Sequence, residues 1–318
     1  MSAIDRLVNQ SLQLWPLPAP ATARLINVSE NRTYLVQTPG IRRVLRLHRP
    51  GYNSIQEIES ELDWMQALAN FGAVNLPAIY PGRDGKRVQS LPGNHHAMVL
   101  FEFIDGTPPS PSGPIEPLFK QLGELSARMH NHTLQWQPPP GFQRFHWDLD
   151  AVFGPSPRWG DWQSAPGITN AIKPILERLT NTLCQRLTSY GQANDRYGLI
   201  HADMRLANLI LNNEKPSVID FDDCGYSWFT YDFAAAISFM EDDPRIPALK
   251  HAWLSGYGSE RSLSPADIQE MDTLIMLRRM ALLAWLGSHP DTSEAAALAT
   301  AFAPTTAKLA ETYLGKFA

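Results

Sequence analysis

The sequence predicts an α+β protein with a small β-rich N-terminal lobe and a larger, mostly helical C-terminal lobe. Strand-like patterns dominate about the first hundred residues, and helical patterns dominate the remainder of the 318-residue chain. Between them lies the Pro/Gly/Ser-rich stretch "PSPSGPIEP", whose composition is typical of a connection. We therefore expect an N-terminal lobe over 1–104, a linker over 105–114 and a C-terminal lobe over 115–318.

The N-terminal lobe is expected to begin with paired strands and one helix. Residues 23–47 alternate between apolar and polar side chains, with a turn at Pro39–Gly40. Residues 54–72 instead place apolar side chains three and four positions apart, which is the spacing of an amphipathic helix. Ser54 and Glu57 have the spacing of a capping box, so the helix is expected to begin at this point.

The elements that follow are predicted from turn signals and periodicity. Asp84–Gly85, within "PAIYPGRDGKRVQSL", is a turn dipeptide and predicts a hairpin. The apolar run over 97–104 predicts a buried strand. Beyond the linker, helical spacing of apolar residues recurs in several segments. The helices expected there cover 115–134, 166–191, 231–241, 245–258, 265–287 and 293–316.

Composition and charge argue against several classes of partner. The chain has 27 basic and 32 acidic residues and a net charge of −5, so no basic surface indicates nucleic acid or an anionic membrane. Two cysteines are too few for a disulfide framework. The N-terminus does not resemble a signal peptide, and no apolar run approaches the roughly 20 residues that span a bilayer. We expect a soluble, cytoplasmic protein, and its oligomeric state is open.

The stretch from Leu199 to Asp223 combines strands with ionisable side chains. "NLIL" and "SVID" are short apolar strands, and "NNEKP" between them is a turn by composition. Folded as a hairpin, these strands bring Asn208 and Asp220 together at the open end. Both side chains supply oxygen, which is the ligand atom that Mg²⁺ prefers. We therefore predict that Asn208 and Asp220 hold a magnesium ion that bridges phosphates.

Asp203 lies in the loop that enters this hairpin, after the apolar run "LIH". It is predicted to orient an attacking hydroxyl group and to accept its proton. Arg205 is predicted to neutralise charge on the transferring phosphoryl group, and the alternative is a salt bridge to Asp222 or Asp223. For Asp222, assistance to the metal or substrate and a surface ion pair both stay open.

The same residues are similar to the motifs of a known family. "HADMRLAN" followed by "IDFDD" resembles the catalytic and metal-binding motifs of the aminoglycoside phosphotransferase and choline kinase family, relatives of the protein kinases. The protein-kinase forms are H-R-D-L-x-x-x-N and D-F-G. His201, Asp203 and Asn208 match the first motif, and Asp220 with Phe221 matches the start of the second. The resemblance implies a protein-kinase-like bilobal fold, ATP and Mg²⁺ as cofactors, and transfer of the γ-phosphoryl group to a hydroxyl.

Two segments that resemble the family's nucleotide-binding lobe depart from its usual form. "ENRTYLV" resembles the loop that covers the phosphates, which implies nucleotide contacts at Ser29 and Asn31, although "INVSENRTY" contains no glycine. "RRVLRL" resembles the strand that presents a lysine to the α- and β-phosphates. Arg46 stands at that position, and its guanidinium is a bulkier fork than an ammonium.

The resemblance also implies the partner of Arg46 and the site of the adenine. "ESELDWMQAL" resembles the helix whose glutamate pairs with the phosphate-binding cation, which implies Glu61, with Glu57 and Glu59 as nearby surface acids. "AMVLFEFIDG" resembles the segment that leads into the hinge, where backbone groups bind adenine. The implied cofactor-binding positions there are Glu102 and Ile104.

The resemblance further implies that the C-terminal lobe contains the catalytic loop and binds the acceptor. Asp232, in "WFTYDFAAA", falls where the family keeps an acid that braces that loop. Only eleven residues separate Asp220 from Asp232, so the long activation segment of a protein kinase is missing. This shortness favours a small acceptor of the aminoglycoside, choline, homoserine or hydroxyamino-acid kind over the alternative, a Ser/Thr protein kinase.

Two other classes of function compete with a phosphotransferase. A non-catalytic nucleotide-binding regulator would explain Arg46 and the glycine-free loop, but it leaves the complete catalytic set unexplained. A metal-dependent hydrolase built on His201, Asp203, Asp220 and Asp223 would need more histidine ligands than this region offers. The aromatic-rich loop over 141–162 is equally compatible with a wall of the acceptor pocket and with apolar anchoring of a long loop.

Overall fold

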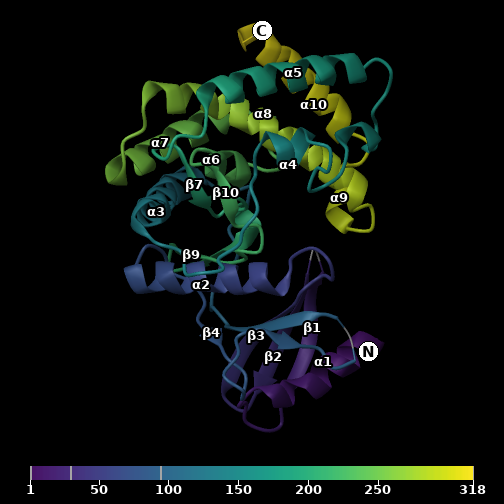
Figure 1. The fold of residues 1–318 in the computed structure, drawn as a ribbon, viewed down its shortest axis with the longest axis vertical. Coiled ribbons are helices and arrows are strands. Elements are labelled where there is room, and N and C mark those ends of the chain that lie inside the picture. The colour runs from purple at the N-terminus through teal and green to yellow at the C-terminus, as the bar shows by residue number, and fades with distance from the viewer. Residues whose placement is uncertain (1, 29–30, 94, 318) are drawn as a thin grey trace. The chain divides into compact units, whose positions relative to one another are not determined.

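The computed structural model describes residues 2–28, 31–93 and 95–317. The chain divides into two compact units that each combine separate stretches of sequence. The first unit comprises Met1–Thr107, Gln137–Arg144 and Ile210–Asp222, and the second comprises Pro108–Trp136, Phe145–Leu209 and Asp223–Ala318. An antiparallel sheet in the N-terminal part of the chain precedes a mostly helical part, which confirms the predicted α+β fold class (Figure 1).

The main sheet of the first unit is antiparallel and has six strands among the described residues. Its strand order is β1-β2-β3-β6-β4, and β5 also pairs with β6. The strands are β1 (Thr22–Val28), β2 (Arg32–Thr38), β3 (Ile41–Leu47), β4 (Ile79–Tyr80), β5 (Gln89–Ser90) and β6 (Ala97–Glu102). The sheet therefore places β3 beside both β2 and β6, away from either edge.

The hairpin predicted about Asp84–Gly85 is wrong. A turn is present, because the Gly85 N–H donates to the Gly82 carbonyl at 3.0 Å and Gly85 has a φ of 80°. However, β4 and β5 on either side of this turn both pair with β6 and not with each other. Both short strands instead extend the main sheet at β6, which is buried along most of its length.

The alternation of β3 directs one arginine away from the main core of the sheet. Leu45 and Leu47 belong to the apolar cluster that β2, β6 and the N-terminal helix share. Arg46 lies between them, so its side chain points to the opposite face. In register, Arg46 is opposite Thr33 on β2 and Val99 on β6, which fixes its backbone on both sides.

Two helices accompany the sheet, and both begin with a capping box. The helix α2 (Ile55–Phe71) has the predicted box of Ser54 and Glu57. The helix α1 (Ala3–Ser11) has a second box, Ser2 with Asp5, that the sequence analysis did not identify. The short 3-10 helix η1 (Leu12–Leu14) follows α1 and contributes Leu12 to the core cluster.

The predicted hairpin of "NLIL" and "SVID" is confirmed. Strands β8 (Leu209–Asn212) and β9 (Lys215–Val218) form a two-stranded sheet. The turn residues Asn213 and Glu214 have φ values of 48° and 63°. Positive φ at both central positions is typical of the turns that match the twist of a hairpin.

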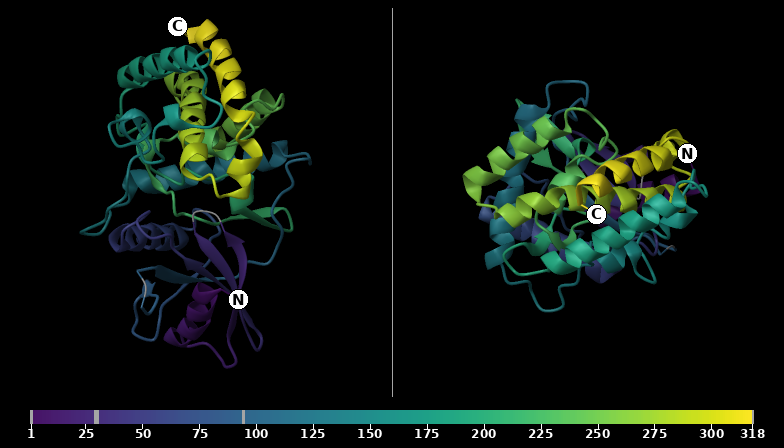
Figure 2. Two further views of the ribbon diagram at one scale, coloured as in Figure 1. Left: turned by 90° about the vertical axis from the view of Figure 1, so that its right-hand side faces the viewer. Right: turned by 90° about the horizontal axis from the view of Figure 1, so that it is seen from above.

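The second unit contains the remaining helices and a small sheet. Strands β7 (Tyr197–Ile200) and β10 (Gly225–Trp228) pair antiparallel. Figure 2 shows helices α5, α8 and α10, which pack on one another. The helices are α3 (Glu116–Gln135), α4 (Leu149–Phe153), η2 (Trp162–Ser164), α5 (Lys173–Tyr190), η3 (Leu206–Asn208), α6 (Tyr231–Ala236), α7 (Ile246–Glu260), α8 (Pro265–Ser288), α9 (Ser293–Leu298) and α10 (Phe302–Phe317).

Three predicted helices have different bounds in the structure. The helix expected over 293–316 is split into α9 and α10, and Pro304 lies in the first turn of α10. Proline lacks a backbone N–H, so it is tolerated in a first turn but not inside a continuous helix. The helix expected over 231–241 ends at Ala236, shortly before Phe239 with its φ of 69°, and the one expected over 166–191 begins at Lys173.

Close packing of α3 on α7 depends on two glycines. A Cβ atom added at Gly123 would lie 2.0 Å from the Trp253 carbonyl oxygen, and one at Gly256 would lie 1.9 Å from the Lys120 carbonyl oxygen. Any larger residue would therefore force these helices apart. None of the helices in the described part of the chain has both the length and the apolar run needed to cross a lipid bilayer.

Candidate active site

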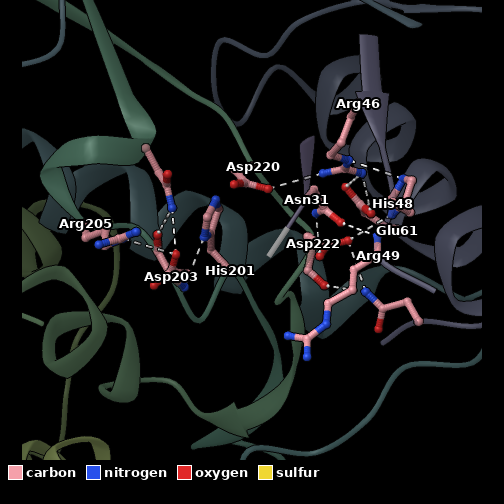
Figure 3. Close-up of polar contacts among 12 residues, drawn as sticks. Asn31, Arg46, His48, Arg49, Glu61, His201, Asp203, Arg205, Asp220 and Asp222 are labelled. Carbon is pink, nitrogen blue, oxygen red and sulfur yellow. Dashed lines mark hydrogen bonds and ion pairs between the residues drawn. The ribbon is translucent and has the colours of Figure 1, made fainter. Parts of the chain in front are cut away.

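A buried ion pair joins β3 to α2 in the first unit (Figure 3). Nη2 of Arg46 donates to both carboxylate oxygens of Glu61, at 2.6 and 2.7 Å. Arg46 and Glu61 are 6% and 0% exposed. Of the two nearby alternatives, Glu57 caps α2 and Glu59 pairs with Arg87. Glu61 is thus the acid of α2 that lies against Arg46.

Arg46 also contacts the predicted metal ligand Asp220. Its Nη1 lies 3.2 Å from Asp220 Oδ1. Burial alone would lower the pKa of Arg46, but the carboxylates of Glu61, Asp222 and Asp220 outweigh burial and raise it. Asp220 has a φ of 62°, in the left-handed region that residues other than glycine rarely adopt. Such backbone strain is common at functional sites.

A second set of polar side chains extends from Arg46 to the predicted phosphate-covering loop. Nε of Arg46 donates to Nε2 of His48 at 3.3 Å, and Nδ1 of His48 lies 3.4 Å from Asp222 Oδ1. Asn31 Nδ2 donates to Asp222 Oδ2 at 2.9 Å, and Asn53 Nδ2 donates to Oδ1 at 3.0 Å. Asp222 is 4% exposed, so the alternative of a surface ion pair is wrong.

The buried His48 makes folding stability depend on pH. Desolvation and the positive charge of Arg46 lower the pKa of His48 from 6.5 to about 4. Below pH 6.5 the unfolded chain binds a proton at this site and the folded chain does not, so stability falls as pH drops from 6.5 towards 4. We expect the free energy of unfolding, measured with urea, to fall between pH 7.5 and pH 5.0 by about 2 kcal/mol more in wild type than in His48→Gln. Equal losses would contradict this assignment.

The predicted base Asp203 is held by charged and polar neighbours in the second unit (Figure 3). Its Oδ2 accepts from Asn208 Nδ2 at 2.7 Å and lies 3.5 Å from Arg205 Nε. Its Oδ1 accepts from Arg278 Nη2 at 2.7 Å. Arg205 in addition pairs with Glu294, at 2.9 and 3.0 Å from its two oxygens. The orientation of the Asp203 carboxylate is therefore fixed from both sides.

Asp232 braces the loop that contains Asp203, as the resemblance implied. Its Oδ1 accepts from the Ala202 N–H at 2.8 Å, and its Oδ2 lies 3.0 Å from His130 Nε2. Ala202 has a φ of 64°, so this bond holds a strained backbone. His201 Nδ1 accepts from the Asp203 N–H at 3.2 Å, which supports a role of His201 in holding the loop.

Arg278 is a residue of this cluster that the sequence analysis missed. It lies in α8 and is 1% exposed, with its Nε donating to Ser238 Oγ at 3.0 Å. The guanidinium lies 5.0 Å from the ring centroid of Trp159 and 6.0 Å from that of Trp147. The sequence feature that could have identified it is a pair of arginines, Arg278 and Arg279, within an otherwise apolar helical segment.

The aromatic loop over 141–162 provides buried anchors in the second unit. Trp147 is 0% exposed, its Nε1 donates to the Asp223 carbonyl at 2.8 Å, and its ring lies 4.5 Å from that of Trp159. Both rings lie near the guanidinium of Arg278, which binds Asp203. The burial of these two side chains supports the anchoring alternative.

The other predicted nucleotide-binding positions are distributed as follows. Ser29 lies outside the described residues, and both ends of the Asn31 amide are bonded, since its Oδ1 accepts from the Arg49 N–H at 3.0 Å. The Glu102 N–H donates to the Ala78 carbonyl at 2.8 Å. The Glu102 N–H is therefore occupied within the sheet, and Ile104 lies two residues beyond the end of β6.

Asn208 and Asp220, the predicted metal ligands, belong to different units. Asn208 ends η3 in the second unit, and Asp220 follows β9 in the first. In the sequence, the paired strands β8 and β9 lie between these two residues. The roles of both residues stay predictions.

The fold and these clusters define a class of protein, the phosphotransferases with a kinase-like fold. The model of the phosphotransferase enzyme family matches residues 22–265. The chain belongs to this family.

Known proteins and solved structures agree with this membership. A structure of a microcompartment-associated aminopropanol kinase is 41% identical, covers 98% of both chains and superposes with a TM-score of 0.90. Amicoumacin kinase from Bacillus subtilis (strain 168) is 25% identical over 275 residues, which is 81% of this chain and 77% of that one. Amicoumacin kinase hAmiN, in complex with AMP-PNP, Ca²⁺ and Ami, is 21% identical with a TM-score of 0.78 over 96% and 94% of the two chains, which shows the shared fold.

Family and fold together confirm the predicted activity. The chain is an ATP-dependent kinase whose acceptor is a hydroxyl group of a small molecule. Solved relatives have been seen with nucleotide, AMP-PNP in amicoumacin kinase hAmiN and ADP in spectinomycin phosphotransferase.

Proposed function

We propose that the chain transfers the γ-phosphoryl group of Mg·ATP to the hydroxyl of a short amino alcohol, of which aminopropanol is the type. The single observation behind this choice is the similarity to the aminopropanol kinase, 41% identity with both chains covered almost completely. The aminoglycoside- and choline-kinase structures among the neighbours are far less similar in sequence.

The charges around Asp203 support a cationic acceptor. The carboxylates of Asp203 and Glu294 pair with the guanidinium groups of Arg205 and Arg278, and the negative charge of Asp223 also acts on Arg278. These five groups leave one net negative charge. The ammonium group of an amino alcohol would neutralise it, whereas a carboxylate on the acceptor would add repulsion.

Asn208 and Asp220 are the proposed magnesium ligands, and the chemistry of both side chains fits this ion. Asn208 Nδ2 donates to the carbonyl and carboxylate oxygens of Asp203, which turns its amide oxygen towards other ligands. Asp220 supplies a carboxylate, and such oxygen donors are what Mg²⁺ prefers. When bound, the ion would offset the negative charge of the phosphates.

The residues of the chain would divide the remaining work. Arg46 is proposed to bind the α- and β-phosphates, with Glu61 fixing its guanidinium. Asp203 is proposed to accept the proton of the acceptor hydroxyl as the new P–O bond forms. Arg278 and Asn208 hold the Asp203 carboxylate in one orientation, and this orientation is what positions the hydroxyl for attack.

ADP release from the purified protein, measured against a panel of acceptors, tests the proposal. The panel contains 1-amino-2-propanol, ethanolamine, choline, homoserine, spectinomycin and casein. Two compounds serve as controls: 1,2-propanediol lacks the amine, and propylamine lacks the hydroxyl. We expect the highest kcat/KM for the aminopropanol, roughly tenfold or more above the propanediol, because the diol lacks the cation. A higher kcat/KM for homoserine, spectinomycin or casein would contradict the proposal.

A further inference from the structure

Each nitrogen of the Arg46 guanidinium has its own partner. Nη2 binds Glu61, Nη1 lies 3.2 Å from Asp220 and Nε donates to His48 at 3.3 Å. A lysine has one nitrogen at the end of a flexible chain, so it could not reach all three groups in fixed directions. The arginine at this position is therefore matched to His48 as well as to Glu61.

The bond from Arg46 fixes the tautomer of His48. Arginine donates hydrogen bonds and cannot accept them, so the His48 Nε2 atom must be the acceptor. A neutral imidazole with an accepting Nε2 has its proton on Nδ1. This N–H points to Asp222 Oδ1, 3.4 Å away. His48 thus links a cation on one side to a carboxylate on the other.

Asp222 continues this link to the phosphate-covering loop. Its Oδ2 accepts from Asn31 Nδ2 at 2.9 Å, and its carbonyl accepts from Arg144 Nη2 at 2.6 Å. Asn31 is 6% exposed, and its Oδ1 accepts the Arg49 N–H. A side chain held at both ends of its amide fixes the backbone of this loop at Asn31, in a segment that has no glycine.

We propose that His48 and Asp222 are positioning residues for Mg·ATP. Together with Arg46 and Asn31 they form what we call the Arg46–Asn31 relay, which holds Asn31 in a set relation to Arg46 and Asp220. This inference rests on the proposed binding of Mg·ATP by Arg46 and Asp220, but not on the identity of the acceptor.

Three substitutions of His48 separate its two hydrogen bonds. His48→Leu removes both, His48→Gln keeps an acceptor for Arg46 Nε, and His48→Asn keeps a donor for Asp222. The readouts are the Kd of Mg·AMP-PNP by calorimetry, KM for ATP, KM for the acceptor, and urea unfolding. We expect His48→Leu to raise the Kd of Mg·AMP-PNP roughly tenfold with an unchanged acceptor KM, and the Gln and Asn variants to lie between it and wild type.

Matched controls separate positioning from loss of structure. His132→Leu removes a histidine of similar burial, 4% exposed against 3%, in the second unit, and it should leave the Kd of Mg·AMP-PNP unchanged. In an Arg46→Lys background, His48→Leu should add little to the Kd, because the shared link is already broken. If His48→Leu does not fold, Asn31→Ala at the loop end of the relay should raise the same Kd.

Wild-type Mg·AMP-PNP affinity in His48→Leu, or in Asn31→Ala where the former does not fold, would overturn the relay. An equal rise in the KM values for ATP and for the acceptor would also overturn it, because that pattern indicates a general loss of structure. Since the calorimetry contains no acceptor, failure of the amino-alcohol assay would leave this test intact.

Discussion

Asp203→Asn is expected to lower kcat by at least about a hundredfold while the Kd of Mg·AMP-PNP stays within about twofold of wild type. The substitution keeps the shape of the side chain but removes the proton acceptor. It also replaces one of the oxygens that bind Arg278 and Asn208 with a donor, so the orientation of the group is lost together with its basicity.

The control for this variant is Asp242→Asn, which changes an exposed acid of the same unit and should retain wild-type kcat. Both variants should be compared at saturating acceptor, so that a change in acceptor binding does not enter kcat. Retention of kcat within tenfold in Asp203→Asn would show that this carboxylate is not the proton acceptor.

Asp220→Ala is expected to act on nucleotide binding itself. The substitution removes a proposed magnesium ligand and one partner of the Arg46 guanidinium. We expect the Kd of Mg·AMP-PNP to rise by about tenfold to a hundredfold, because hydrogen bonds and contacts to charged groups are the strong ones. Calorimetry with and without Mg²⁺ measures this effect.

The dependence on magnesium distinguishes loss of a ligand from a general loss of affinity. In the presence of EDTA, wild type and Asp220→Ala should differ much less in nucleotide affinity than they do with Mg²⁺. Glu214→Gln, which changes an exposed acid of the first unit at the turn between β8 and β9, should behave as wild type under both conditions. An unchanged magnesium dependence in Asp220→Ala would contradict its role as a ligand.

Local signals in the sequence predicted the parts of the fold that depend on nearby residues. The box of Ser54 and Glu57 marks the start of α2, and the composition of "NNEKP" marks the turn between β8 and β9. These features depend on contacts within a few residues, so short patterns are sufficient to identify them. Ser2 and Asp5 have the same capping-box spacing, which also marks the start of α1.

Parts of the structure that depend on distant partners were not predictable in this way. The turn at Asp84–Gly85 was recognised, but its flanking strands pair with β6, a strand that lies outside the segment containing the turn. Periodicity likewise could not show that the helical pattern over 293–316 is interrupted, although Pro304 gave a local reason to expect it.

The same limit applies to the candidate site. The motif spacing identified Asp203 and Asn208, and the resemblance of "RRVLRL" and "ESELDWMQAL" to segments of the family pointed to Arg46 and Glu61, which the structure pairs. Arg278, by contrast, lies 75 residues from Asp203 in the chain, and no motif connects the two. Its contact with Asp203 follows only from the fold, which brings α8 against the loop that contains Asp203.

Phosphorus-31 NMR of the reaction product tests the central claim most directly, the claim that a hydroxyl oxygen held by Asp203 receives the phosphoryl group. The protein is incubated with Mg·ATP and 1-amino-2-propanol, with Asp203→Asn in parallel. We predict ADP and one phosphomonoester in wild type, with the phosphorus coupled to the carbinol proton, and no ester in the variant over the same time. Inorganic phosphate alone, a phosphoramidate on the amine, or equal ester formation by both proteins would contradict the account.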